Sequence, residues 1–205
     1  LTPGQTEADF SEWGLTPQDA KLLAPEIAVN GSMTECKLRN NKLGVEGWTI
    51  IFNTLRDSPT SKITTWDLYN ERLGPEIAKP LAEYISVTAE LTKCDLRGNK
   101  MGVEGWTNIF NALRDSPTSK IAEWDLSAIL WVEDLGPAIV KPLAEYLSVT
   151  ASLIVVDLRY NRLDIESATT LATVAKEKGI SLCGIKPEQT EADFTPRKNG
   201  WNKME

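Results

Sequence analysis

The sequence predicts an α/β solenoid, a horseshoe-shaped arc with a parallel β-sheet on its concave face and α-helices on its convex face. Two observations predict this fold. First, residues 41–68 and 99–126 are identical at 23 of 28 positions, which gives an internal repeat of 58 residues. Second, a shorter phrase recurs within that period and alternates with segments of helical periodicity. Repeats on this scale are typical of solenoids, in which each unit buries its apolar face against its neighbours.

The shorter phrase marks the expected strands. Its template is L-x-x-L-x-L-x-x-N-x-L, and copies span 33–43, 63–73, 91–101 and 153–163, with a broken copy that starts at 121. A weaker first strand is expected near Ala8–Phe10, with Trp13 where the asparagine belongs. The central core position of the later strands alternates between small and large residues: Cys36, Trp66, Cys94, Trp124, Val156 and, by extension, Cys183.

Each expected strand is followed by an expected helix. Apolar residues of two successive helices follow the i, i+3, i+4, i+7 spacing of one helical face: Trp48, Ile51, Phe52 and Leu55, then Ala78, Leu81, Ala82 and Ile85. Pro17, Pro75 and Pro137 stand where a first helical residue belongs. Pro80 and Pro142 lie deeper, so their helices are expected to start late or to kink.

The interval is 58 residues because large and small core residues alternate between neighbouring units. Where the strand carries the small Cys36, its helix carries Trp48 and Phe52; where the strand carries Trp66, its helix carries alanines. Since a packed interior keeps a constant density, a larger side chain on the strand must be matched by smaller side chains on the helix. The tryptophans are therefore interpreted as core residues. Cys36 and Cys94 lie two strands apart, roughly 9–10 Å, which is beyond disulfide reach.

The strand template is the leucine-rich-repeat signature. With 27–32 residues between core positions, residues 6–185 resemble the ribonuclease-inhibitor-like subtype of leucine-rich-repeat proteins. The near-identical copies also resemble arrays expanded in unicellular eukaryotes. The resemblance implies protein recognition through the concave face and the strand-to-helix edge. It further implies that Asn41, Asn99 and Asn161 bond backbone groups of adjacent repeats, while Glu71 and Glu133 replace that asparagine in the intervening repeats.

Side chains that flank each core position point to the concave face. They form three rows with eight acids and five bases, and the middle row is nearly all Asp. The candidate partner-binding residues are Glu35, Lys37, Arg39, Asp67, Tyr69, Lys93, Asp95, Arg97, Glu123, Asp125, Asp157 and Arg159. Two interpretations stay open. One is a solvated surface whose charges pair with one another, and the other is a recognition face with an acidic centre for a basic patch on a protein partner.

An insertion after the fifth expected strand is a second candidate site. Aligning 126–135 with 68–73 leaves four extra residues, near Ile129, Leu130, Trp131 and Val132. Apolar residues are not expected to stay free on a loop, and an exposed Trp is a common binding anchor. The alternative is that this loop folds back over its own edge.

Composition excludes several classes of function. The net charge of −7 argues against a nucleic-acid partner, because phosphate binding needs clustered Lys and Arg. The chain has no His, and it shows no nucleophile–base pair, phosphate loop or metal-ligand cluster. We therefore expect no enzymatic activity, no metal and no cofactor. No apolar run approaches the ~20 residues of a membrane helix, and the three widely spaced Cys favour an intracellular, reducing compartment.

The two ends of the chain share a sequence, because QTEADF at 5–10 recurs at 189–194. Residues 1–185 are expected to form a solenoid of about six strand–helix units. Residues 186–205 are expected to be the incomplete start of a further repeat or a C-terminal tail. The end repeats of solenoids need polar caps. We therefore expect that this end either continues into a longer array or associates with a neighbouring copy.

The expected function is a non-catalytic scaffold that binds a protein partner. Its contact surfaces are the concave strand face and the strand-to-helix loop edge. Two alternatives stay open: a regulatory leucine-rich-repeat module such as a small-GTPase activator, and an accessory structural subunit of a large assembly. The sequence does not identify the partner, since fold can be argued from pattern whereas function needs a site.

Overall fold

Short parallel strands and the helices between them form one solenoid. The computed structural model describes residues 1–2, 4–127, 136–161 and 163–191. Its strands are β1 (Glu7–Asp9), β2 (Glu35–Lys37), β3 (Thr65–Asp67), β4 (Lys93–Asp95), β5 (Glu123–Asp125) and β6 (Val155–Asp157). Its helices are α1 (Pro17–Val29), α2 (Gly44–Arg56), α3 (Pro75–Val87), α4 (Gly102–Arg114), η1, a 3-10 helix (Gly136–Ile139), α6 (Val140–Val149) and α7 (Ile165–Lys178).

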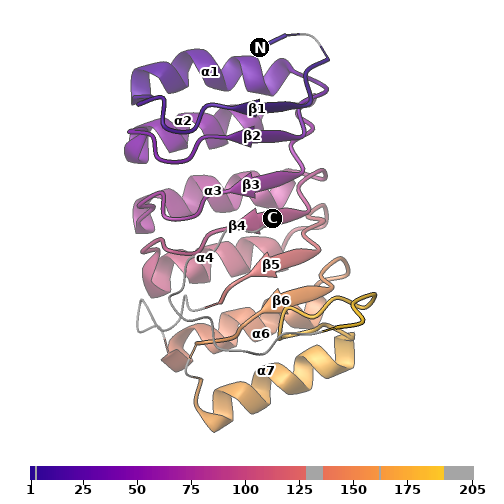
Figure 1. The fold of residues 1–205 in the computed structure, drawn as a ribbon. Helices are drawn as coiled ribbons and strands as arrows, with labels where there is room; N and C mark the ends of the chain where they lie inside the picture. The colour runs from indigo at the N-terminus through magenta and orange to yellow at the C-terminus, as the bar shows by residue number, and fades with distance from the viewer. Residues whose placement is uncertain (3, 128–135, 162, 192–205) are drawn as a thin grey trace.

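The strands pair in the order of the sequence, from β1 to β6, in one parallel sheet. Figure 1 shows them stacked as a ladder, with the helices on one side of it. The predicted α/β leucine-rich-repeat type of solenoid is therefore confirmed. The opposite side of the sheet, which carries no helices, is called the concave face below.

Strand register places the predicted core residues side by side. Trp66 pairs with Cys94, Cys94 with Trp124, and Trp124 with Val156. All four side chains are buried, as are Cys36 and the apolar template positions that flank the strands. Cys36 and Cys94 are free thiols, as predicted, and burial raises the pKa of Cys36 to about 12.

Cys183 does not continue this row, and its predicted core position is wrong. Ser181 forms a parallel bridge with Val155, but the next bridge, between Asp157 and Cys183, is antiparallel. Cys183 is exposed, whereas its neighbour Leu182 packs against the core. The backbone turns back at this point instead of extending as a seventh strand.

The prolines act as predicted at helix starts but not inside α3. Pro17 and Pro75 are the first residues of α1 and α3. Pro142 lies in a helix that starts late, at Val140, after the 3-10 turn of η1. Pro80 has no such effect on the start of α3, because buried apolar residues on both sides of it hold the first turn in place while only one backbone hydrogen bond is lost.

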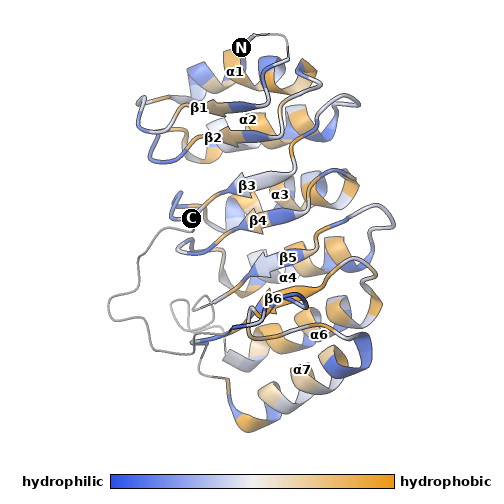
Figure 2. Cartoon of the chain, turned by 45° about the vertical axis from the view of Figure 1, so that its right-hand side comes forward, coloured by the Kyte–Doolittle hydropathy of each residue, from blue (hydrophilic) through white to orange (hydrophobic). Residues whose placement is uncertain are grey.

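The core alternates between large and small residues, as the 58-residue period predicts. Trp48 and Phe52 of α2 contact the Trp66 ring edge to face, with centroids 6.2 and 6.4 Å away. The next helix, α3, carries the small Ala78 where α4 packs closely against it. A Cβ atom on Gly105 of α4 would lie 3.2 Å from the Ala78 Cβ. Figure 2 shows hydrophobic and hydrophilic bands that alternate along the helices, as expected for helices with one face in the core.

The two aromatic clusters differ in one hydrogen bond. In the first, the Trp66 indole Nε1 donates to the Tyr84 hydroxyl at 3.0 Å. In the second, Trp124 and Tyr146 occupy the same places with ring centroids 6.2 Å apart. The Trp124 Nε1 is nevertheless buried without an acceptor among the described residues.

Tyr84→Phe is expected to lower the free energy of unfolding by about 1–3 kcal/mol, because it leaves the buried Trp66 N–H without an acceptor. Tyr146→Phe is the matched control. It removes an equivalent hydroxyl but no indole hydrogen bond, so its effect is expected to be smaller. Urea unfolding followed by tryptophan fluorescence measures both variants, and equal losses of stability would contradict this assignment.

The repeated sequence near the two ends folds into the same turn. The backbone N–H of Gln5 donates to the Thr2 carbonyl at 3.2 Å, and the backbone N–H of Gln189 donates to the Lys186 carbonyl at 3.0 Å. In both turns the glutamine side-chain oxygen accepts the backbone N–H of the first residue, at 3.1 Å from Thr2 and 3.2 Å from Lys186. The first copy leads directly into β1; the remainder of the second copy lies beyond the described residues.

Candidate functional site

The concave face carries the three predicted rows of polar side chains. The strand register places Glu35, Thr65, Lys93, Glu123 and Val155 in one row. It places Asp67, Asp95, Asp125 and Asp157 in the next. Residues two positions after this Asp row complete the surface where each strand ends. The twelve candidate residues thus lie on one face of one sheet.

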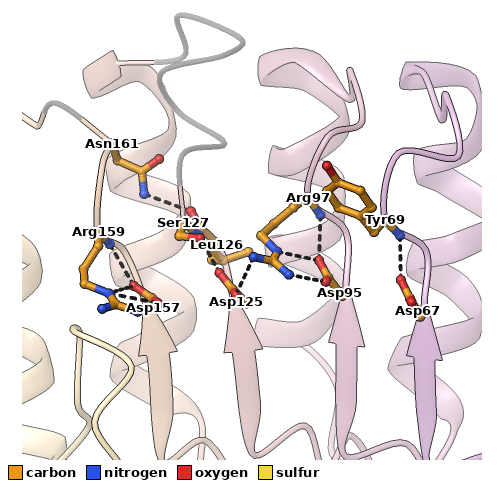
Figure 3. A network of polar contacts seen from close by, with 10 residues as sticks. All are labelled: Asp67, Tyr69, Asp95, Arg97, Asp125, Leu126, Ser127, Asp157, Arg159 and Asn161. Atoms are coloured by element: carbon orange, nitrogen blue, oxygen red, sulfur yellow. Dashed lines mark hydrogen bonds and ion pairs between the residues drawn. The ribbon is translucent and has the colours of Figure 1, made fainter. Parts of the chain in front are cut away.

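The Asp row caps the ends of the strands. In each of these strands the carboxylate Oδ1 accepts the backbone N–H of the residue two positions later, at 2.9–3.1 Å. The pairs are Asp9–Ser11, Asp67–Tyr69, Asp95–Arg97, Asp125–Ser127 and Asp157–Arg159. Asp95 and Asp157 are also buried. This row is therefore held by the fold itself, as Figure 3 shows for four of the five strands.

Arginines neutralise much of the Asp row. The Arg97 guanidinium contacts Asp95 at 2.6 Å and reaches across to Asp125 at 3.0 Å. Arg159 contacts Asp157 at 2.6 Å. Burial raises the pKa of Asp125, and the nearby charge of Arg97 opposes that effect. The repulsion expected between carboxylates on neighbouring strands is thus offset by the arginines two positions further along (Figure 3).

Strand β2 departs from this pattern. Lys37 occupies the position of the Asp, so Arg39 has no carboxylate two positions before it. Arg39 reaches Asp67 of the next strand through one nitrogen at 3.4 Å, and its Nε is buried without a partner among the described residues. Lys37 makes a loose ion pair with Glu35 at 3.6 Å.

Tyr69 lies between two guanidiniums. The Arg39 and Arg97 guanidinium carbons lie 5.7 and 5.8 Å from the centroid of its ring, within the range of cation–π contacts. Partial burial raises the pKa of Tyr69, and the charge of Arg97 opposes the rise. The ring therefore stays neutral at physiological pH and forms an aromatic surface between two positive charges.

The chain's own C-terminal segment covers the β6 end of the concave face. Gly184, with φ +70°, packs so closely on Asp157 that a Cβ atom would lie 2.9 Å from its Oδ2. Lys186 then extends to Glu123 of β5, with an Nζ–Oε1 distance of 2.6 Å. This contact could not be predicted, because the two residues are 63 positions apart and belong to no shared pattern.

The strand-to-helix edge is built on the predicted asparagines. The Asn99 amide nitrogen donates to the Leu68 and Leu96 carbonyls, both at 2.8 Å, and its oxygen accepts the Leu73 N–H at 3.0 Å. Asn41 and Asn161 bond adjacent repeats in the same way. The role that the family resemblance implies for these residues is therefore observed.

Glu71 replaces the asparagine at one repeat and helps to form a polar cavity. Its Oε1 accepts the Asn40 backbone N–H at 3.0 Å. Burial raises the pKa of Glu71, while this hydrogen bond opposes the rise. A shallow cavity of about 270 Å³ opens beside it, lined by Asn40, Asn41, Lys42, Asn70, Glu71 and Arg72.

The second candidate site lies outside the described residues. Ile129, Leu130, Trp131 and Val132 all belong to 128–135, as does Glu133. Within the described ranges, no group of three or more His, Cys, Asp or Glu is placed to hold a metal ion. No helix of that part of the chain has the length and apolar character needed to cross a membrane.

Comparisons with known proteins show what the chain is similar to, although no protein-family model matches it. It is 35% identical to Ran GTPase-activating protein 1 of Xenopus laevis over 108 residues, which are 50% of this chain and 18% of that protein. It is 28% identical to NACHT, LRR and PYD domains-containing protein 2 of Homo sapiens over 171 residues, 83% of this chain and 15% of that protein. It is 28% identical to ribonuclease inhibitor of Mus musculus over 169 residues, 82% of this chain and 36% of that protein.

These relatives are leucine-rich-repeat proteins, and the chain spans 36% or less of the length of each. Among solved structures, the chain is similar to Leiomodin-1 Actin-Binding Site 2, with a TM-score of 0.60 at 17% identity. That match covers 76% of this chain and 87% of the other. At such low identity the likeness concerns the fold alone.

Proposed function

Because the chain is a leucine-rich-repeat solenoid of the ribonuclease-inhibitor-like type, we propose that it binds a protein partner without catalysing a reaction, and that the partner lies on the concave face over β2, β3 and β4. The observation that supports this choice of surface is the contrast between two parts of the same face. Over β5 and β6, Gly184 and Lys186 cover the strands. Over β2 to β4, within the part of the chain that the structure describes, the half-buried Tyr69 ring lies beside loosely paired cations, with Lys37 and Arg39 44% and 36% exposed.

Composition of this surface fits protein recognition. Tyr and Arg are enriched among the residues that dominate binding energy at protein interfaces, since each offers a large, well-ordered contact area together with polar groups. Here Tyr69 is held between Arg39 and Arg97. Free, buried thiols at Cys36 and Cys94 also fit an intracellular, reducing compartment.

Cross-linking mass spectrometry of the complex purified from its native source tests the proposal. Lysines occur on both sides of the solenoid: Lys37 and Lys93 on the concave strands, and Lys21 and Lys79 on the helices. The expected result is partner cross-links to the concave pair and not to the helical pair. Cross-links confined to Lys21 and Lys79 would overturn the choice of surface. Loss of partner capture on Trp131→Ala alone would move the contact to the insertion.

A regulatory role toward a small GTPase is the second candidate function. It is favoured by the 35% identity over 108 residues to Ran GTPase-activating protein 1 and by the polar cavity at the strand-to-helix edge. The test is the rate of GTP hydrolysis by a small GTPase in the presence of the chain. An acceleration that Asn70→Ala and Arg72→Ala abolish would support this role, and an unchanged rate would exclude it for the GTPase used.

A further inference from the structure

We propose that the partner contacts the concave face with an acidic peptide segment, and that a carboxylate of this segment binds at Arg39 and Lys37 beside Tyr69. The inference rests on the proposed function, since it names the chemistry of a partner at the same face. It reverses the expectation of an acidic centre, because the carboxylates that formed that centre are bonded within the fold.

The charged side chains over β2 to β4 carry a small excess of positive charge. These strands and their ends contribute four cations, Lys37, Arg39, Lys93 and Arg97, against three acids, Glu35, Asp67 and Asp95. The local balance is thus positive by one in a chain whose net charge is −7. Over β5 and β6 the same rows hold Glu123, Asp125, Asp157 and Arg159, a balance of minus two.

The cations over β2 to β4 differ in how closely they are paired with carboxylates of the chain. On β4, Arg97 has three close contacts: its Nε to Asp95 at 2.9 Å, a terminal nitrogen to Asp95 at 2.6 Å, and another to Asp125 at 3.0 Å. On β2, Arg39 has one long contact to Asp67. Within the described ranges, Lys93 makes no ion pair, and Lys37 makes only the loose contact to Glu35.

Strand β2 has no carboxylate at the position where the other strands carry the capping Asp. In the other five strands, an Asp two positions before the residue at the strand end accepts the backbone N–H of that residue. Lys37 stands in that place on β2 and offers no acceptor. The Arg39 Nε, which corresponds to the bonded Nε of Arg97, is consequently buried without a partner. A carboxylate from a partner would supply the charge that β2 lacks.

Tyr69 supports the side chain of Arg39. Its ring contacts the Arg39 guanidinium on one side and the Arg97 guanidinium on the other. An arginine whose plane is ordered by stacking loses less conformational entropy when it binds a carboxylate through two parallel N–H groups.

Selection from a library of random linear peptides tests this inference. Peptides that bind the wild-type chain are synthesised and titrated by calorimetry into wild type, Arg39→Gln and Lys37→Gln. Controls matched in net charge are Arg56→Gln and Lys79→Gln, which remove cations from the helices α2 and α3. Chemical shifts of backbone amides identify the surface that each peptide contacts, and thermal unfolding checks that every variant is folded.

The expected result is enrichment of Asp and Glu in peptides that shift amides of β2 to β4. Their affinity should fall about tenfold in Arg39→Gln, as for loss of a charge-assisted hydrogen bond, and should change less than about twofold in the controls. Arg39→Lys should recover only part of the affinity, because an ammonium cannot offer the planar fork. Lys37, whose side chain is 44% exposed, provides a substitution that leaves the fold intact.

Two outcomes would overturn the inference in different ways. Peptides that bind β2 to β4 without an excess of acids, or that bind Arg39→Gln and Lys37→Gln as tightly as wild type, would contradict the anionic contact and leave the proposed function standing. Selected peptides that contact only the helices would contradict both.

Discussion

Replacing Trp66 by alanine is expected to lower the free energy of unfolding by about 3–5 kcal/mol, as for truncation of a fully buried large aromatic side chain. Trp66 is 1% exposed and packs edge to face against both Trp48 and Phe52. The helix that follows it, α3, contributes Tyr84, whose hydroxyl accepts the Trp66 indole N–H at 3.0 Å, so truncation also removes this buried hydrogen bond. Guanidinium unfolding followed by circular dichroism measures the change.

Trp13→Ala is the control for that experiment. Trp13 is 67% exposed and contacts Phe10 edge to face, with centroids 5.1 Å apart. Its replacement is expected to change stability by less than about 1 kcal/mol. Equal effects at the two tryptophans would contradict the assignment of Trp66 to a core whose volume is shared between neighbouring repeats.

The second large effect is expected at Asn99. Asn99→Ala should lower the free energy of unfolding by about 2–4 kcal/mol, since it leaves buried backbone groups of Leu68, Leu73 and Leu96 without their partner. Asn41→Ala removes the same kind of contacts from a partly buried site. Water can replace some of those contacts, so a smaller loss is expected there.

Urea unfolding of both asparagine variants, measured side by side, tests this ranking. A larger loss at Asn41 than at Asn99 would show that the bonds between repeats do not depend on burial as described. A loss below about 0.5 kcal/mol at both sites would place them among neutral surface substitutions and remove the asparagine ladder from the account of stability.

Much of the fold could be predicted because each repeat imposes its packing on the next. The alternation of Cys36, Trp66, Cys94 and Trp124 predicts the register of the strands, and the structure confirms it. The prediction fails at Cys183, where the chain turns back over Asp157. Among the described residues, this segment bridges to β6 on one side only, so the packing of a following repeat does not determine its conformation there.

The candidate site was harder to predict than the fold. Sequence alternation places Asp67, Asp95 and Asp125 on the concave face, and the register confirms that position. Position alone does not reveal whether a carboxylate faces a partner or caps its own strand. The donor of each cap is the backbone N–H two places after the Asp, which any residue except proline supplies. Whether it meets the carboxylate depends on the turn geometry at the strand ends.

Chain-wide electrostatics gave the opposite impression from local electrostatics. A net charge of −7 and a row of Asp favour a basic partner, and this was one of the two open interpretations. Hydrogen bonds and ion pairs within the sheet occupy most of those acids. Over β2 to β4 the side chains of Lys37 and Arg39 are 44% and 36% exposed and only loosely paired. With Lys93 they give this part of the face a local excess of positive charge, which favours a partner with carboxylates at the contact.

The central claim is that the partner binds over β2 to β4, and the affinity of the natively purified partner for two variants tests it most directly. Tyr69→Leu removes the ring between Arg39 and Arg97, whereas Lys79→Glu alters a helix residue whose side chain is 81% exposed. We predict that the dissociation constant rises at least about tenfold for Tyr69→Leu, the effect of losing a central interface anchor, and stays unchanged for Lys79→Glu. An unchanged dissociation constant for Tyr69→Leu in a folded protein would contradict the claim.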